Sequence, residues 1–165
     1  PYDKHILGRM LVEAATADGK LGEEEESFLI EFLEDESVEQ IAQRPTLTEA
    51  ELGECSTGGV RETMLLLASV LALSDEQLEA TEKQKLEHFA TGLGITGPRR
   101  FDVAKKAQTF ILDQAMEKMF EWGGHDETAR AELLELADRI GMDRRSAAVA
   151  EAQFQKRRGS AAQGR

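Results

Sequence analysis

The stretch of sequence that decides the fold is Ala17-Asp18-Gly19-Lys20-Leu21, with Glu25 four residues further on. Apolar residues with helical spacing precede and follow it. Its Asp-Gly pair is typical of the end of a helix, where glycine adopts a left-handed backbone conformation that other residues avoid. The sequence therefore predicts two helices, over residues 3–17 and 22–35, joined by a short bend.

The same frame occurs a second time, 57 residues later. The two copies share the spacing D-x-x-L-x-x-x-E and consist of Asp18, Leu21 and Glu25, and of Asp75, Leu78 and Glu82. The second copy also lies between two apolar segments, which predict helices over 60–73 and 79–93. Residues 60–73 are apolar on most faces, which favours a place at the centre of the molecule. We expect the two hairpins to be related by a pseudo-two-fold rotation, to pack on one another and to bring their acidic side chains onto one face.

The rest of the chain is also expected to be helical. Short helices are predicted near 38–43 and 48–52, a long one over 98–122, and two more over 127–140 and from 143 onward. Thr46 and Glu49 have the spacing of a capping box. The predicted apolar stripe of the long helix is Phe101, Ala104, Ala107, Phe110, Ile111, Ala115, Met119 and Trp122. No segment has the alternation of a strand, so the predicted fold is all-α, a compact bundle of pseudo-symmetric hairpins with roughly seven to nine helices.

Three regions are expected in this bundle. Residues 1–97 form a helical core with the two D-x-x-L-x-x-x-E hairpins, residues 98–158 add helices packed on the same domain, and residues 159–165 form a flexible basic tail. A partial third repeat links the first two regions. Gly94-Ile95 and Gly141-Met142 both follow an apolar helix, and each pair predicts a Schellman turn whose second residue folds back onto the last helical turn. In this third copy Trp122 and Ala129 stand in place of the two acidic residues.

Composition narrows the function classes. The chain has 165 residues, 41% of them hydrophobic and 32% charged, as expected of a globular protein. Its longest apolar run is far shorter than the ~20 residues of a spanning helix, so no direct membrane insertion is expected. A single cysteine excludes an internal disulfide and favours the cytoplasm. The net charge is −12, and residues 1–140 alone carry −16, which argues against nucleic acid as a partner. The basic segment Lys156-Arg157-Arg158 is interpreted as a frayed, solvated end.

Four carboxylates are the candidate site residues: Asp18, Glu25, Asp75 and Glu82. Oxygen ligands without nearby His or Cys suit Ca²⁺, Mg²⁺ or Mn²⁺ better than Zn²⁺. An EF-hand is excluded, because Lys20, Gly22 and Glu23 occupy positions where its loop needs oxygen ligands and a glycine. The alternative stays open that both glutamates cap helices from the N3 position and that both aspartates form Asx turns.

Other chemistry has little support in the sequence. His5, His88 and His125 are scattered, and His88 is interpreted as a core or rim residue. Cys55 has no cationic neighbour in sequence to lower its pKa. Gly58-Gly59-Val60-Arg61 is a weak anion-binding pattern, and the basic residues near 99–106 are interpreted as a solvated face. Without a nucleophile–base pair, a phosphate loop or a cofactor fingerprint, we expect no enzyme and no organic cofactor.

The first frame, on a helical hairpin and with an echo 57 residues later, resembles the tellurite-resistance TerB family over about residues 4–96. The resemblance implies a compact all-helical cytoplasmic domain that acts in chemical-stress responses. It also implies a divalent metal held by the acidic positions of the two bends, which makes Asp18, Glu25, Asp75 and Glu82 the ligands. Membrane-bound TerC-type proteins would be the partners, so the domain would lie at the inner face of the membrane. The second bend departs from the pattern, because Ser74-Asp75-Glu76 replaces Ala-Asp-Gly.

These observations predict a cytoplasmic TerB-like stress-response module with an acidic divalent-cation site, acting through partner proteins. Two alternatives remain. The first is a metal-free interaction or scaffold domain whose acidic surface docks a basic partner or the cytoplasmic loop of a membrane protein. The second is a metal-dependent hydrolase that uses the same carboxylates, for which no general base is visible nearby in the sequence.

Overall fold

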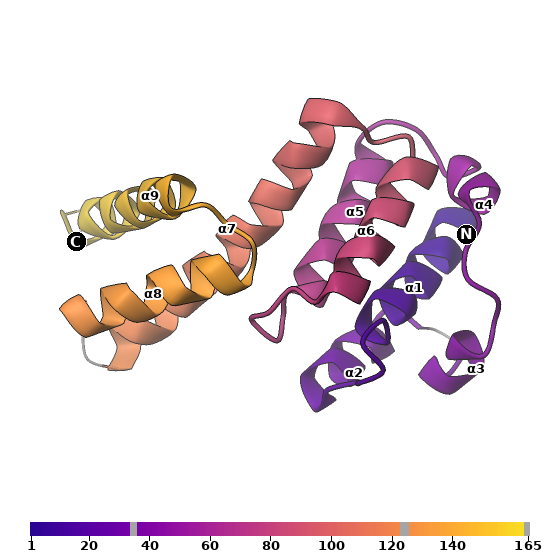
Figure 1. The fold of residues 1–165 in the computed structure, drawn as a ribbon, viewed down its shortest axis with the longest axis horizontal. Coiled ribbons are helices and arrows are strands. Elements are labelled where there is room, and N and C mark those ends of the chain that lie inside the picture. The colour runs from indigo at the N-terminus through magenta and orange to yellow at the C-terminus, as the bar shows by residue number, and fades with distance from the viewer. Residues whose placement is uncertain (34–35, 123–125, 164–165) are drawn as a thin grey trace.

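The computed structural model describes residues 1–33, 36–122 and 126–163, and within these ranges it contains nine α-helices and no strand (Figure 1). The helices are α1 (Tyr2–Ala15), α2 (Glu23–Ile30), α3 (Val38–Ala42), α4 (Glu49–Gly53), α5 (Gly59–Ala72), α6 (Ala80–Gly92), α7 (Gly97–Trp122), α8 (Glu127–Arg139) and α9 (Arg144–Gln163). The all-α prediction is confirmed. Residues 34–35 at the expected end of the second helix, the glycines at 123–124, His125 and residues 164–165 lie outside the described residues.

The two predicted hairpins share one core. α5 packs against α1 on one side and α7 on the other, and α1 also packs against α6. The helical spacing predicted for α1 is confirmed, because Ile6, Met10, Leu11 and Ala14 are all buried. The central place of α5 is confirmed as well. A pseudo-two-fold rotation between the hairpins stays a prediction.

The buried side chains form two clusters that meet along α7. The first gathers residues of α1 to α6 and the start of α7 up to Val103, and the second gathers the rest of α7 with α8 and α9. Figure 1 shows this arrangement, with α7 running away from the N-terminal helices toward the layer formed by α8 and α9. Leu66 of α5 packs against both clusters.

The predicted apolar stripe of α7 is wrong in part. Phe101 and Phe110 are 75% and 48% exposed. The buried positions are Val103, Ala107, Ile111, Leu112, Ala115 and Met116. Ala107, Ile111 and Ala115 are buried as predicted, whereas Val103, Leu112 and Met116 were not in the predicted stripe. The buried side of α7 faces the two clusters in succession, and both phenylalanines lie beside it.

The two predicted Schellman turns are confirmed. The Ile95 amide donates to the Ala90 carbonyl and the Met142 amide to the Ala137 carbonyl, each at 2.8 Å. The preceding Gly94 has φ +68°, and Gly141 has φ +78°. Ile95 and Met142 are both buried, so each turn directs one apolar side chain back onto the helix that it ends.

Two local predictions need correction. The capping box before α4 consists of Thr48 and Glu51 instead of Thr46 and Glu49, because the chain stays extended through Thr48 while Leu47 is buried. The basic segment Lys156–Arg158 is part of α9 and does not fray. Arg157 pairs with Asp113 of α7 at 2.7 Å, and the guanidinium of Arg158 lies 4.6 Å from the centre of the Phe120 ring. Of the expected tail, residues 159–163 continue α9.

Candidate site at the two bends

The first bend is held by its own acidic side chains. Asp18 Oδ1 accepts a hydrogen bond from the Lys20 amide at 2.8 Å, which is an Asx turn. Gly22 is the N-cap of α2, and its amide donates to Glu25 Oε2 at 2.7 Å. Gly19 between them has φ +78°. Both roles expected from capping alone are therefore present at this bend.

The second bend repeats these bonds one by one. Asp75 Oδ1 accepts from the Gln77 amide at 3.0 Å, and Glu82 Oε2 accepts from the amide of Glu79, the N-cap of α6, at 2.8 Å. Glu76 occupies the place of Gly19 and also has a positive φ of 63°. Replacement of glycine by Glu76 therefore leaves the second bend in the same left-handed backbone conformation as the first. A residue with a side chain is strained in this conformation, whereas glycine is not.

The four carboxylates act on one another across the two hairpins. The pKa of Glu82 is raised to about 7, first by burial and also by the negative charges of Asp75, Asp18 and Glu25, while a hydrogen bond from the Glu79 amide acts in the opposite direction. Glu82 is only 4% exposed. Burial also raises the pKa of Glu25, with Asp75 and Asp18 adding to the rise, while the Gly22 amide and Ser74 lower it. The charges of Asp18, Glu25, Asp75 and Glu82 therefore act across the two hairpins, while the sharing of one ion by the four groups stays a prediction.

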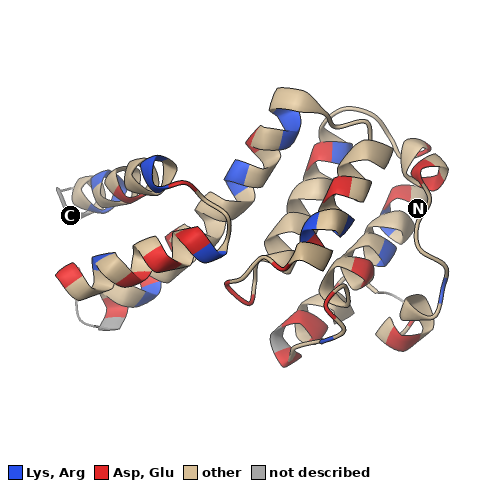
Figure 2. Ribbon diagram, in the orientation of Figure 1, with Lys and Arg blue, Asp and Glu red and all other residues tan. Residues whose placement is uncertain are grey.

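The geometry of this cluster differs from that of a finished metal centre. Within the described ranges, no group of three or more His, Cys, Asp or Glu side chains is placed to ligate one ion. One oxygen of each carboxylate already accepts a backbone amide, which leaves the second oxygen of each as the donor for a ligand. Figure 2 marks acidic residues along the ribbon of both bends, and these bends lie at the same end of the N-terminal helices. What the cluster can do chemically is to attract a cation, because each carboxylate disfavours the charge of the others.

The remaining candidates have structural roles. His88 is partly buried and lies 2.6 Å from the Leu47 carbonyl, in line with its interpretation as a rim residue. Cys55 is buried, and burial raises the pKa of its thiol. Arg61 donates hydrogen bonds to the carbonyls of Gly53, Cys55 and Leu93. Its guanidinium therefore binds backbone carbonyls next to Gly58-Gly59, where the weak anion-binding pattern would need it for an anion.

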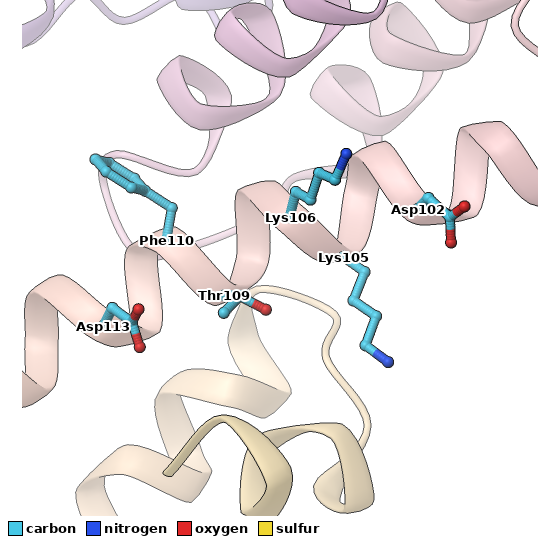
Figure 3. A pocket seen from close by; sticks show the side chains of 6 residues that line it. All are labelled: Asp102, Lys105, Lys106, Thr109, Phe110 and Asp113. Atoms are coloured by element: carbon cyan, nitrogen blue, oxygen red, sulfur yellow. The ribbon is translucent and has the colours of Figure 1, made fainter. Parts of the chain in front are cut away.

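The basic face of α7 is only partly solvated. Arg99 pairs with Glu62 and Arg100 with Glu87. Figure 3 shows the next turns of the helix, where Lys105, Lys106, Thr109, Phe110 and Asp113 line a hollow together with Asp102. The sequence did not predict this hollow, because its pattern placed Phe110 in the buried stripe and the lysines on a solvated face.

Comparison with known proteins adds no family to these observations: no family model, no curated protein and no solved structure matches this chain. In the part of the chain that the structure describes, no helix is long and apolar enough to cross a membrane. The resemblance to TerB-like domains therefore stays a prediction.

Proposed function

We propose that this protein is a non-catalytic binding module in which Asp18, Glu25, Asp75 and Glu82 share one divalent cation. The observation that supports the proposal most is the state of Glu82, whose buried carboxyl has its pKa raised to about 7 in the company of three further carboxylates. A bound cation would favour the charged form of all four groups at once. The all-oxygen donor set favours Ca²⁺, Mg²⁺ or Mn²⁺.

The module would act through a protein partner in the cytoplasm, at the inner face of the membrane if a TerC-type protein is that partner. A role in tellurite or another chemical-stress response follows from the TerB resemblance alone and is part of the proposal on that basis. The frames that carry the resemblance are the same two frames that form the carboxylate cluster.

Isothermal titration calorimetry with CaCl₂, MgCl₂ and MnCl₂ tests the cation site. Replacing both aspartates, as Asp18→Asn with Asp75→Asn, should weaken divalent binding by about ten-fold or more, which is 1.4 kcal/mol. Asparagine can still accept the amide bonds of the two Asx turns, so the bends should persist. The control is Asp102→Asn with Glu132→Gln, which removes the same charge from exposed positions on α7 and α8 and should leave affinity unchanged.

A metal-free interaction module is the second candidate, and one specific observation favours it. All four carboxylates already accept a backbone amide, so helix capping and Asx turns account for their spacing without an ion. In that case the acidic surface itself would dock a basic partner. Wild-type protein that gives no heat with any of the three ions at millimolar concentration would overturn the cation site and leave this candidate.

A further inference from the structure

An apolar groove of about 670 Å³ lies between α2, α5 and α7 and reaches the two bends at Glu25 and Glu76. Leu66, Leu67 and Val70 of α5 contribute to its lining, with Phe28 of α2 and Phe110 of α7 on either side. The groove follows the line where the two buried clusters meet, since Leu66 packs against both of them. Its size and composition are those of a ligand site, apart from its open side.

The side chains around this groove are more exposed than their chemistry favours. Phe110 is 48% exposed, and Leu66, Leu67 and Val70 are each only partly buried. By contrast, Leu71 and Ile111, which also line the groove, are buried. A contiguous patch of exposed apolar side chains marks an interaction site, whereas single exposed apolar residues do not.

The two edges of the groove carry opposite charge. Lys106 and Lys118 belong to the α7 edge, and Glu25 and Glu76 belong to the edge formed by α2 and the second bend. Twelve residues of helix separate the two lysines, so they lie about 18 Å apart along α7, or just over three turns. Within the residues that the structure describes, neither lysine pairs with a carboxylate, whereas Glu76 has Arg139 at 3.7 Å.

Lys106 and Phe110 point from the same side of α7 toward the groove. Figure 3 shows Lys106 and Phe110 leaving α7 on the side of α5 and the second bend, while Lys105 leaves on the opposite side, toward α8 and α9. A charged side chain and an aromatic ring one helical turn apart thus face the same space. The neighbouring Lys105 provides a built-in comparison, with the same charge on another face.

We propose that this groove binds an amphipathic α-helix of a partner protein. The apolar stripe of that helix would cover Leu66, Leu67, Val70 and the Phe110 ring, its acidic flank would face Lys106 and Lys118, and its basic flank would face Glu25 and Glu76. A partner helix of just over three turns spans the 18 Å between the lysines, so its acidic flank can reach both of them. An acyl chain with one headgroup would leave one of the lysines, about 18 Å apart along α7, without a counter-charge, which is why the charge pattern selects a helix.

The test uses a fluorescein-labelled synthetic peptide of about four helical turns, with leucine at i, i+3, i+4 and i+7, glutamate on one flank and lysine on the other. Fluorescence anisotropy should give saturable binding to the full chain. Phe110→Asp should weaken binding by about ten-fold or more, and so should Lys106→Glu with Lys118→Glu. Phe101→Asp and Lys105→Glu change exposed positions of α7 that do not line the groove and should leave binding within about two-fold of wild type. All five positions are exposed, and circular dichroism checks that the variants fold.

A charge exchange makes the test directional. A second peptide with lysine on both flanks should bind the Lys106→Glu/Lys118→Glu protein more tightly than the mixed peptide does, because both edges are then acidic. The proposal is overturned by the absence of saturable binding, by an equal loss in the Phe101 control, or by lauric acid binding through Phe110 where the peptide does not. The groove and the cation site share Glu25, and variants at other positions tell them apart: Asp18→Asn/Asp75→Asn should leave peptide binding intact, and Phe110→Asp should leave divalent binding intact.

Discussion

Glu82 combines a stabilising bond and a destabilising environment in one side chain. Its carboxylate satisfies the amide of the N-cap Glu79 and lies at the positive end of α6, where negative charge is favoured. At the same time it is almost fully buried beside three other acids, and burial is the largest cause of its raised pKa. The side chain is therefore better accommodated in its protonated form.

The sign of the resulting pH dependence follows from the two pKa values. The unfolded pKa is 4.5 and the folded one about 7, so the folded state binds this proton more tightly. The corresponding stability is complete below pH 4.5 and is lost as the pH rises through about 7, with an upper size on the order of 3 kcal/mol at 1.36 kcal/mol per pKa unit. The raised pKa of Glu25 acts in the same direction.

We predict that Glu82→Gln stabilises the protein at pH 8 and changes its stability much less at pH 5. Glutamine keeps an oxygen for the Glu79 amide but carries no charge, so only the electrostatic part is removed. Urea unfolding in the presence of a chelator measures the free energy at both pH values. Glu132→Gln, on the exposed face of α8, is the control and should show no such difference. Equal effects of Glu82→Gln at pH 5 and pH 8 would contradict the assignment of the proton to this group.

At the scale of elements, α4 and α6 approach each other closely at Gly92. A Cβ built on Gly92 would lie 2.5 Å from Leu52 Cδ1, 2.8 Å from Leu52 Cβ and 3.2 Å from the Cα atom of Glu49. The last of these is backbone, so rotation of a side chain cannot relieve the contact. Glycine at this point of α6 allows the short α4 to lie directly on it, with Leu52 fully buried between them.

We predict that Gly92→Ala destabilises the protein by about 1–3 kcal/mol, although alanine is the better helix former. The reason is that α4 has to move away from α6. Thermal unfolding measures the loss. Gly53→Ala is the matched control, because its Cβ would meet nothing nearer than the Gly92 carbonyl at 3.8 Å, and it should be neutral or slightly stabilising. A stabilised Gly92→Ala protein would show that the two helices are not packed this closely.

These elements also show what the sequence could predict. The bends, the helix starts at Gly22 and Glu79 and the two Schellman turns depend on residues within one turn of each other, so local chemistry specified them. The exposed side of α7 could not be predicted in the same way. Its buried line is set by two clusters from distant parts of the chain, and an apolar period alone cannot tell a phenylalanine beside a core from one inside it.

For the candidate site too, the sequence could predict some features, and others depend on packing between distant parts of the chain. Repetition of one frame was enough to predict that the two hairpins pack on each other. A common site of Asp18, Glu25, Asp75 and Glu82 stays a prediction, although the charges of the first three act on Glu82. The burial of Glu82 was not predictable, because it depends on packing of the hairpins side by side. The groove was not predictable either, as its walls come from α2, α5 and α7, which are far apart in sequence.

At the scale of the whole molecule, repulsion between negative charges opposes folding. The chain carries −12 overall, and the folded state brings acidic side chains of two hairpins into one place. Several basic residues of the C-terminal half are already used, since Arg157 and Arg158 pair with α7 and Arg139 with Glu76. Repulsion at the two bends is therefore left for solvent ions or a bound cation to reduce.

We therefore predict that a millimolar divalent chloride raises the Tm of the protein more than NaCl at equal ionic strength. Monovalent salt only screens the repulsion, whereas a cation that binds the folded form alone adds RT ln(1 + [L]/Kd), about 2.7 kcal/mol at a hundred-fold excess over Kd. Glu25→Gln with Glu82→Gln should remove most of the difference between the two salts, even though the baseline Tm of this variant is expected to be higher. Differential scanning fluorimetry across matched ionic strengths measures both effects. Equal stabilisation by the two salts would mean that screening of an acidic surface is the whole effect, and the four carboxylates would then be helix caps and turn residues without an ion.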